Sequence, residues 1–443
     1  MSPKNLSGSS LQVAGLDISK VSVIGLGRLG APFALACASR GFSVIGVDVN
    51  PHRVRELSGG RFPWWEPKAQ EYLETFKDNL RFSTRHEDAI EHSDISVILT
   101  ATPSEPDGKF SSRFVCRALH ALAASQAKAR KPLHAYIISS TLFPSAFRAD
   151  VLPLLEPLRD AGLDFRACYC PEFVALGKVI DDFLMPDFVV IGEPDEESGD
   201  VAETFYRRLT TNPHLRVIRT NTINAELAKI SLNVFLTVKI SFANLVAEIC
   251  ERFKGADVDV VSYVLGKDSR ISPHFLKGGA AFGGSCFPRD VKVFQYLTKS
   301  FAPPLGWSIE RINARQVWRL AEQIMLLEKR EVCILGTSFK PGTSETTESP
   351  SHKLIELLLP RGYRIVVHDP HALEQTRTRF GNAIEYRDNP IECLSTPVVV
   401  VMVPHKEYLR LYKHFKKDQF VFDIWRIYKN KPLECKYWGI GLG

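Results

Sequence analysis

Val21-Ser22-Val23-Ile24-Gly25-Leu26-Gly27-Arg28-Leu29-Gly30 is the stretch that decides the fold of this chain. Its first four residues have the composition of a buried strand, and the Ala-rich segment 31–40 that follows predicts a helix. Residues 42–47 predict a second strand, which ends at Asp48. A GxGxxG turn between strand and helix, with an acid about 20 residues on, is typical of a dinucleotide-binding βαβ unit.

Each residue of this fingerprint has a physical task. Gly25 allows the tight turn, Gly27 lets a pyrophosphate approach the N–H groups of the helix N-terminus, and Gly30 lets helix and strand pack closely. Asp48 can accept hydrogen bonds from the ribose hydroxyls and would repel a 2′-phosphate. We therefore expect NAD rather than NADP, with Arg53 close enough in sequence to soften the preference.

Bulk composition narrows the function classes. A chain of 443 residues predicts two or three domains, and a net charge of +6 suits anionic small molecules. No dense Lys/Arg run suggests a nucleic-acid partner, and no uninterrupted apolar run of about 18 residues suggests a membrane span. The nine cysteines include no CxxC pair, so we expect neither a metal site nor disulfides, and a cytoplasmic location.

Polar side chains follow three further predicted strands of the same domain. Residues 95–99 lead to Thr102, residues 136–139 lead to Thr141, and residues 165–170 lead to Glu172. Because open α/β sheets bind ligands beyond the carboxyl ends of their strands, we expect these side chains near the cofactor or the reacting group. The alternative for each threonine is a hydroxyl that caps the next helix.

Residues 224–254 contain no Gly or Pro before Gly255 and predict one helix about 45 Å long. Glu226, Lys229 and Asn233 share one face of it. A solvated polar stripe is the simpler interpretation, but the apolar neighbours of Lys229 and Asn233 favour a specific polar contact. We expect this helix to join domains and to form the seam of a homodimer.

The segment 278–290 places one cysteine, Cys286, among glycines, with Asp290 four residues later. Such a thiol is either an incidental turn residue or one that a substrate can reach. A second α/β unit begins at residue 332, and its first loop, 336–343, offers Lys340 to a phosphate-bearing ligand.

We predict an α/β protein with two Rossmann-like doubly wound domains joined by a long central helix and a helical dimerisation region. The expected divisions are a flexible tail at 1–19, an NAD-binding domain at 20–220, a central helical domain at 221–327 and a C-terminal Rossmann-like domain for a phosphate-bearing ligand at 328–443.

Over residues 20–430 the chain resembles the nucleotide-sugar 6-dehydrogenases, the group of UDP-glucose 6-dehydrogenase and GDP-mannose 6-dehydrogenase. The resemblance rests on ordered motifs: the glycine fingerprint with Asp48, Glu66-Pro67, Thr102-Pro103, Ser140-Thr141, Pro171-Glu172-Phe173 with Gly177, Lys229 with Asn233, Asp268-Ser269-Arg270-Ile271, the Gly-Gly-Ser-Cys-Phe-Pro loop with Asp290, Phe339-Lys340-Pro341 and Glu348-Ser349-Pro350. It implies that the domain at 328–443 binds a nucleotide sugar. It also implies oxidation of a sugar C6 alcohol to a carboxylate with two equivalents of NAD.

The resemblance also implies the catalytic roles. Cys286 would form a thiohemiacetal and then a thioester, Lys229 and Asn233 would stabilise the oxyanion, and Asp290 would handle protons. Glu172 and Thr141 would position or activate the hydrolytic water.

Binding residues are implied in the same way. The expected cofactor-binding residues are Gly25, Gly27, Leu29, Gly30, Asp48, Arg53, Thr102, Thr141 and Arg289. The expected substrate-binding residues are Phe173, Lys229, Asn233, Arg270 (reaching across the dimer), Phe275, Lys277, Gly283, Phe287, Phe339, Lys340 and Arg426.

Departures from the family pattern gather around the nucleotide and sugar. They are Leu176, Ala281, Arg289, Gly342, Thr347 and the segment Asp423-Ile424-Trp425-Arg426. We expect UDP-glucose 6-dehydrogenase activity in polysaccharide biosynthesis. Three alternatives stay open: another nucleotide sugar such as GDP-mannose, a homologue that binds without turnover, and a one-step hydroxyacid dehydrogenase. The last leaves Cys286 and the second α/β unit unexplained.

Overall fold

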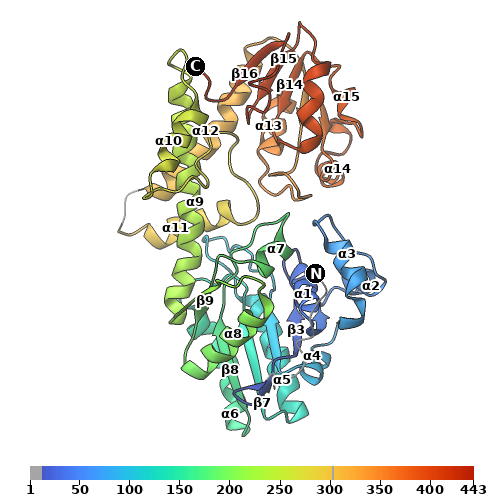
Figure 1. Ribbon diagram of the computed structural model, residues 1–443, viewed down its shortest axis with the longest axis vertical. Helices are drawn as coiled ribbons and strands as arrows, with labels where there is room; N and C mark the ends of the chain where they lie inside the picture. Colours follow the sequence, from blue (N-terminus) through green and yellow to red (C-terminus); the bar gives the residue numbers. More distant parts are fainter. Residues whose placement is uncertain (1–11, 302–303) are drawn as a thin grey trace. The chain divides into compact units, whose positions relative to one another are not determined.

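The computed structural model describes residues 12–301 and 304–443. The chain divides into two compact units, one ending at Lys229 and one beginning at Ile230, and each is described by itself. Figure 1 draws both units and labels many of their elements.

The first unit is built on an eight-stranded sheet in the order β10-β9-β8-β7-β6-β3-β4-β5. Neighbouring strands are parallel except β8 and β9, which meet antiparallel at one pair. The strands are β3 (Lys20–Ile24), β4 (Ser43–Val47), β5 (Leu80–Ser83), β6 (Ile95–Ile98), β7 (Leu133–Ile138), β8 (Asp164–Tyr169), β9 (Phe188–Gly192) and β10 (Arg216–Thr220). The run from β5 to β8 has the Rossmann strand order, as the glycine fingerprint predicted.

Helices cover both faces of this sheet. They are α1 (Gly30–Ser39), α2 (Pro51–Ser58), α3 (Ala69–Thr75), α4 (His86–His92), α5 (Arg113–Ala129), α6 (Glu156–Asp160), α7 (Val179–Leu184) and α8 (Glu196–Leu209), with a π-helix, η2 (Phe147–Val151). One hydrophobic cluster joins α1 and α8 to the sheet, and a second joins α4 and α5 to its other face. Strands buried on both faces explain the continuous apolar runs of the sequence.

The expected flexible tail differs from the structure at residues 12–19; residues 1–11 lie outside the described part. β1 (Gln12–Val13) and β2 (Leu16–Asp17) pair as a hairpin. Leu16 and Ile18 are buried in the first hydrophobic cluster, so apolar burial orders this segment.

The long helix, α9 (Thr222–Cys250), has 29 residues. It begins two residues before the predicted start, where the Asn221 carboxamide accepts a hydrogen bond from the Asn224 N–H (2.9 Å). It ends four residues early because the N–H groups of Arg252 and Phe253 bond to carbonyls three residues back. By length and composition α9 could cross a membrane, but Glu226, Asn233 and Asn244 on it bond to other protein segments, as in the core helix of a globular protein.

The second unit holds a six-stranded parallel sheet in the order β13-β12-β11-β14-β15-β16. Its strands are β11 (Glu331–Leu335), β12 (Arg364–His368), β13 (Glu385–Tyr386), β14 (Val398–Val401), β15 (Phe420–Asp423) and β16 (Lys436–Gly439). Its helices include α10 (Val258–Lys267), α11 (Phe287–Thr298), α12 (Leu305–Met325), α13 (Pro350–Leu358), α14 (Leu373–Phe380) and α15 (Pro390–Cys393). The predicted second Rossmann-like sheet is thus present. The central helical domain expected at 221–327 includes α9, α10, α11 and α12.

Candidate active site

The glycine turn of the first unit has the geometry that a dinucleotide requires. Gly25 has φ +92°, and a Cβ there would meet the Leu99 carbonyl oxygen at 2.8 Å. Gly30 lies against the Gly25 carbonyl, whereas a Cβ on Gly27 would find no atom within 4 Å. The open side of the turn is therefore at Gly27, beside the N-terminus of α1, where a pyrophosphate would fit.

Asp48 organises the next part of this region. One carboxylate oxygen accepts hydrogen bonds from the Leu26 N–H (2.7 Å) and from Arg53 Nη1 (2.9 Å), and the other accepts from the Asn50 N–H (2.8 Å). Arg53 thus neutralises Asp48 directly, which gives a structural basis for the weaker cofactor preference expected from the sequence.

The sequence analysis missed Arg28 and Trp64 in this region. The guanidinium carbons of Arg28 and Arg53 lie 5.3 and 5.8 Å from the centre of the Trp64 ring. This cationic, aromatic shelf beside Asp48 suits an anionic, planar ligand. A signal was present in the sequence, because the pair Trp64-Trp65 directly precedes Glu66-Pro67.

Glu172, Phe173 and Lys229 meet within the first unit. Lys229 Nζ donates to the Glu172 carbonyl oxygen, lies 3.3 Å from its carboxylate and sits 5.0 Å from the centre of the Phe173 ring. Thr102 and Thr141 are buried at the carboxyl ends of β6 and β7, as expected from the strand pattern. This unit therefore groups a lysine and a carboxylate of the expected catalytic set.

Asn233 and Asp290 meet within the second unit, and Cys286 precedes Asp290 by one turn of α11. Cys286 is exposed and is the N-cap residue of α11. Asp290 lies in the first turn of α11, fully buried, and accepts a hydrogen bond from the Asn233 amide at 2.6 Å. Asn233 follows Lys229 by one turn of α9, so the predicted polar face is used for specific contacts rather than solvation.

The cysteine loop packs against the loop that carries Phe339. The Gly284 N–H donates to the Thr347 carbonyl oxygen (2.9 Å), and Gly284 has φ +83°. A Cβ on Gly284 would lie 2.9 Å from the Phe339 ring, and one on Gly283 would collide with the Glu348 carbonyl oxygen. The two glycines therefore permit the close approach of the nucleophile loop and the predicted nucleotide loop.

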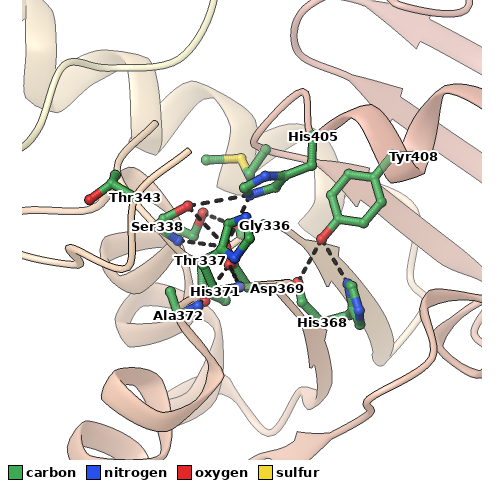
Figure 2. A network of polar contacts seen from close by, with 12 residues as sticks. Gly336, Thr337, Ser338, Thr343, His368, Asp369, His371, Ala372, His405 and Tyr408 are labelled. Carbon is green, nitrogen blue, oxygen red and sulfur yellow. Dashed lines mark hydrogen bonds and ion pairs between the residues drawn. The ribbon is translucent and has the colours of Figure 1, made fainter. Parts of the chain in front are cut away.

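A buried polar network holds the start of that nucleotide loop (Figure 2). Asp369, at the end of β12, accepts hydrogen bonds from the N–H groups of Thr337 (2.7 Å), Ser338 (2.9 Å), His371 (2.8 Å) and Ala372 (2.9 Å). Burial alone would raise the pKa of Asp369, but His405 and these donors hold it below its usual value. Lys340 follows Ser338 by two residues, so the network anchors the base of its loop.

The same network resembles a hydrolase triad only in composition. Ser338 Oγ donates to Asp369 (2.9 Å), and His405 Nε2 lies 3.4 Å from that hydroxyl and 3.3 Å from the same carboxylate oxygen. A triad requires the acid on the other ring nitrogen. We therefore assign Ser338, His405 and Asp369 a structural role.

Several expected substrate residues are exposed in the second unit. Arg270, with 85% of its side chain exposed, pairs with Asp268. Phe275, with φ +63°, stacks edge-on against Phe287, whose ring centre is 6.3 Å away, and Lys277 points to solvent.

Arg426 is placed differently from the expectation. Its five N–H donors are occupied by Asp259 (3.0 and 2.7 Å) and by the carbonyl oxygens of Ile424 (3.3 Å), Ile440 (2.8 Å) and Gly278 (2.8 Å). No donor is left for a substrate, so we leave Arg426 out of the site.

The departures from the family pattern also have local explanations. The Ala281 methyl is buried in the core of the second unit. Arg289 Nε lies 3.4 Å from Asp290, and the Thr347 hydroxyl donates to Glu345 at 2.5 Å. Among the described residues, no group of three or more His, Cys, Asp and Glu side chains is placed to hold a metal ion.

Comparison with known proteins matches all three parts of the chain. Residues 19–210 match the NAD binding domain of the UDP-glucose/GDP-mannose dehydrogenase family, residues 223–315 its central domain and residues 333–430 its UDP binding domain.

Individual relatives fall in both branches. The chain is 33% identical to the GDP-mannose 6-dehydrogenase of Pseudomonas aeruginosa over 392 residues, 86% of this chain and 87% of that one. It is 31% identical to the UDP-glucose 6-dehydrogenase of Haloferax volcanii over 422 residues, 92% of this chain and 97% of that one. A UDP-glucose dehydrogenase structure from Pyrobaculum islandicum matches with TM-score 0.88 and 31% identity, covering 99% of this chain and 100% of that one.

Proposed function

Because the chain belongs to the UDP-glucose/GDP-mannose dehydrogenase family, whose members are NAD-dependent oxidoreductases of nucleotide sugars, we propose that it oxidises the C6 alcohol of a nucleotide-diphosphate hexose to the uronic acid. UDP-glucose is the first candidate substrate. The observation that carries the proposal is the exposed Cys286 at the N-terminus of α11, followed one turn later by the buried Asp290.

The chain's residues account for each step. NAD, when bound, accepts the hydride in both oxidations. Loss of the first hydride and a proton gives an aldehyde, and the Cys286 sulfur bonds to its carbon to form a thiohemiacetal. Loss of a second hydride from the carbon and of the proton from its hydroxyl gives a thioester. Water then breaks the carbon–sulfur bond, which releases the acid and regenerates the thiolate.

The proposal also gives roles to the remaining residues. Lys229 and Asn233 stabilise the oxyanion by charge and hydrogen bonding, and Asp290 exchanges protons with the substrate oxygen. Glu172 and Thr141 orient the hydrolytic water. Gly25, Gly27, Leu29, Gly30, Asp48, Arg53, Thr102 and Arg289 hold the cofactor, and Phe173, Arg270, Phe275, Lys277, Gly283, Phe287, Phe339 and Lys340 hold the nucleotide sugar.

Two observations bear on the choice of substrate. The similarity to the Pyrobaculum islandicum UDP-glucose dehydrogenase structure, with TM-score 0.88, supports UDP-glucose. Several relatives at 32–34% identity are named GDP-mannose 6-dehydrogenases, which makes GDP-mannose the second candidate.

A panel of UDP-, GDP- and dTDP-sugars incubated with NAD tests the proposal by following NADH. We expect NADH formation with one member, UDP-glucose first, and loss of acid formation by about 10³-fold or more in Cys286→Ser. Absence of NADH with every member would leave a homologue that binds without turnover. Acid formation at the wild-type rate in Cys286→Ser would exclude the thioester route.

Assembly and location are also part of the proposal. Phe235, Phe242 and Ile249 on α9 and Tyr263 on α10 are each about half exposed or more, a large apolar surface for a protein monomer. We infer a cytoplasmic homodimer through α9, with the functional division at 20–220, 221–327 and 328–443.

A further inference from the structure

Two buried glutamates of the first unit have no part in the chemistry above. Glu66 and Glu226 are 6% and 0% exposed, and each accepts two backbone N–H groups. We propose that Glu66 and Glu226 are positioning residues that hold the segments of Glu172 and Thr141 for the attack of water on the thioester. This inference rests on the roles proposed above for Glu172 and Thr141.

Glu226 holds the segment that follows β7. Its carboxylate oxygens accept from the N–H groups of Ser145 (2.7 Å) and Phe147 (2.8 Å). Phe147 begins η2, and Thr141 lies between the end of β7 and this anchor. Because the strand fixes one end of this short connection and Glu226 fixes the other, the Thr141 backbone is held from both sides.

Glu66 does the same for the segment that follows β8. Its oxygens accept from the N–H groups of Gly177 (3.0 Å) and Val179 (2.8 Å). Val179 begins α7, and Glu172 lies between the end of β8 and this anchor. Glu66 lies outside both β8 and α7, so it caps the N-terminus of α7 from a distant part of the chain.

The two anchors share one geometry. In each, the carboxylate binds the N–H of the first helical residue and the N–H two residues earlier. The earlier residue has positive φ in both cases, +76° at Ser145 and +85° at Gly177. Converging N–H groups of this kind form an anion-binding concavity. Left-handed backbone at the non-glycine Ser145 is strained, and the carboxylate contacts offset that strain.

The long helix couples the two segments. Glu226 and Lys229 lie in the first two turns of α9. Glu226 accepts hydrogen bonds from the segment that follows Thr141, and Lys229 donates to the carbonyl oxygen of Glu172. Burial raises the pKa of Glu226, opposed by the Phe147 and Ser145 N–H groups. One helix end thus fixes the separation of the two strand-end segments.

The test is a step-resolved measurement on Glu226→Gln and Glu66→Gln in the full-length protein. In each variant an NH₂ group can replace one acceptor oxygen and face a backbone N–H. We expect hydrolysis of the acyl-enzyme to slow by about 100-fold, while the pre-steady-state NADH burst stays within a few-fold of wild type. Mass spectrometry of the quenched protein should then show the acyl adduct accumulating on Cys286.

Two further variants keep the test decisive. Asp94→Asn is the matched control. Asp94 accepts the Asp17 N–H (2.8 Å) directly before β6, at the amino-terminal ends of the strands and therefore away from Thr141 and Glu172. The Asp94→Asn variant should lose stability without adduct accumulation. Glu226→Asp keeps the charge but withdraws it by one methylene, so it should fold and show an intermediate defect in the same step.

The outcomes separate the two claims. If the wild type forms two NADH per sugar but the glutamate variants keep the wild-type ratio of burst to steady-state rate, Glu66 and Glu226 are merely structural and the inference is overturned. If the wild type forms no acid at all, the proposed function fails, and the inference fails with it.

Discussion

Protonation of His352 is expected to lower the stability of the second unit at acidic pH. The residue is buried on α13, with Nε2 3.1 Å from the Thr376 hydroxyl and its ring edge-on to Phe380. Burial lowers the pKa of His352 from 6.5 to about 4. Between these pH values His352 is protonated in the unfolded chain but not in the folded protein. The free energy of unfolding therefore falls as the pH decreases from 6.5 to 4.

The size of this effect follows from the pKa shift. The contribution is absent above pH 6.5 and reaches about 3 kcal/mol near pH 4, at 1.36 kcal/mol per unit. We expect His352→Gln to flatten this part of the pH dependence, measured by urea unfolding at steps between pH 7.5 and 4.5. Equal slopes for the variant and the wild type would contradict the assignment.

At the level of single residues, the sequence predicted which side chains belong to a motif better than it predicted the distant groups that hydrogen-bond to them. Asp48 follows from residue type and spacing, because the end of the second strand of a βαβ unit is a fixed offset from the glycine turn. The hydrogen bond between Asn233 and Asp290 was not predicted, because the two residues lie 57 positions apart on different helices. Glu66 was recognised as a motif but its partners, the N–H groups 111 and 113 residues away, were not predictable. Arg426 was misplaced because its acid partner, Asp259, lies 167 residues earlier in the chain.

The packing of two loops in the second unit depends on Gly284. Its left-handed backbone and the 2.9 Å approach that a Cβ would make to the Phe339 ring both oppose any side chain. We expect Gly284→Ala to lower the free energy of unfolding by about 1–3 kcal/mol and turnover by at least tenfold. Urea unfolding and steady-state NADH kinetics measure the two effects.

Gly362 provides the matched control for this element. It has φ +77°, but a Cβ there would meet no atom within 4 Å. Gly362→Ala should therefore show the backbone cost without the loss of turnover. Equal turnover in the two variants would show that the contact with Phe339 has no catalytic importance.

Elements with strong periodicity were predicted well and their ends less so. The helix expected at 224–254 is present at Thr222–Cys250, and both Rossmann-like sheets occur where apolar runs alternate with helical segments. The hairpin at residues 12–17 was not predicted, because two-residue strands carry no periodic signal and are ordered by tertiary packing.

At the scale of the whole molecule, the exposed apolar face of α9 and α10 predicts a dimer. Stable interfaces bury about 1,200–2,000 Å² in total, and a charge at the centre of an apolar patch opposes association. We expect Phe242→Glu to yield monomers by light scattering during size-exclusion chromatography. Ile391→Glu, at a similarly exposed apolar residue on α15, should remain dimeric, and a dimeric Phe242→Glu would refute the seam.

The thioester mechanism requires two successive oxidations of each sugar at Cys286. Its most direct test is the stoichiometry of NADH formed per nucleotide sugar consumed, measured to completion with limiting substrate. We predict two NADH and one uronic acid per sugar for the wild-type protein. One NADH per sugar, with a free aldehyde as the product, would contradict the thioester mechanism.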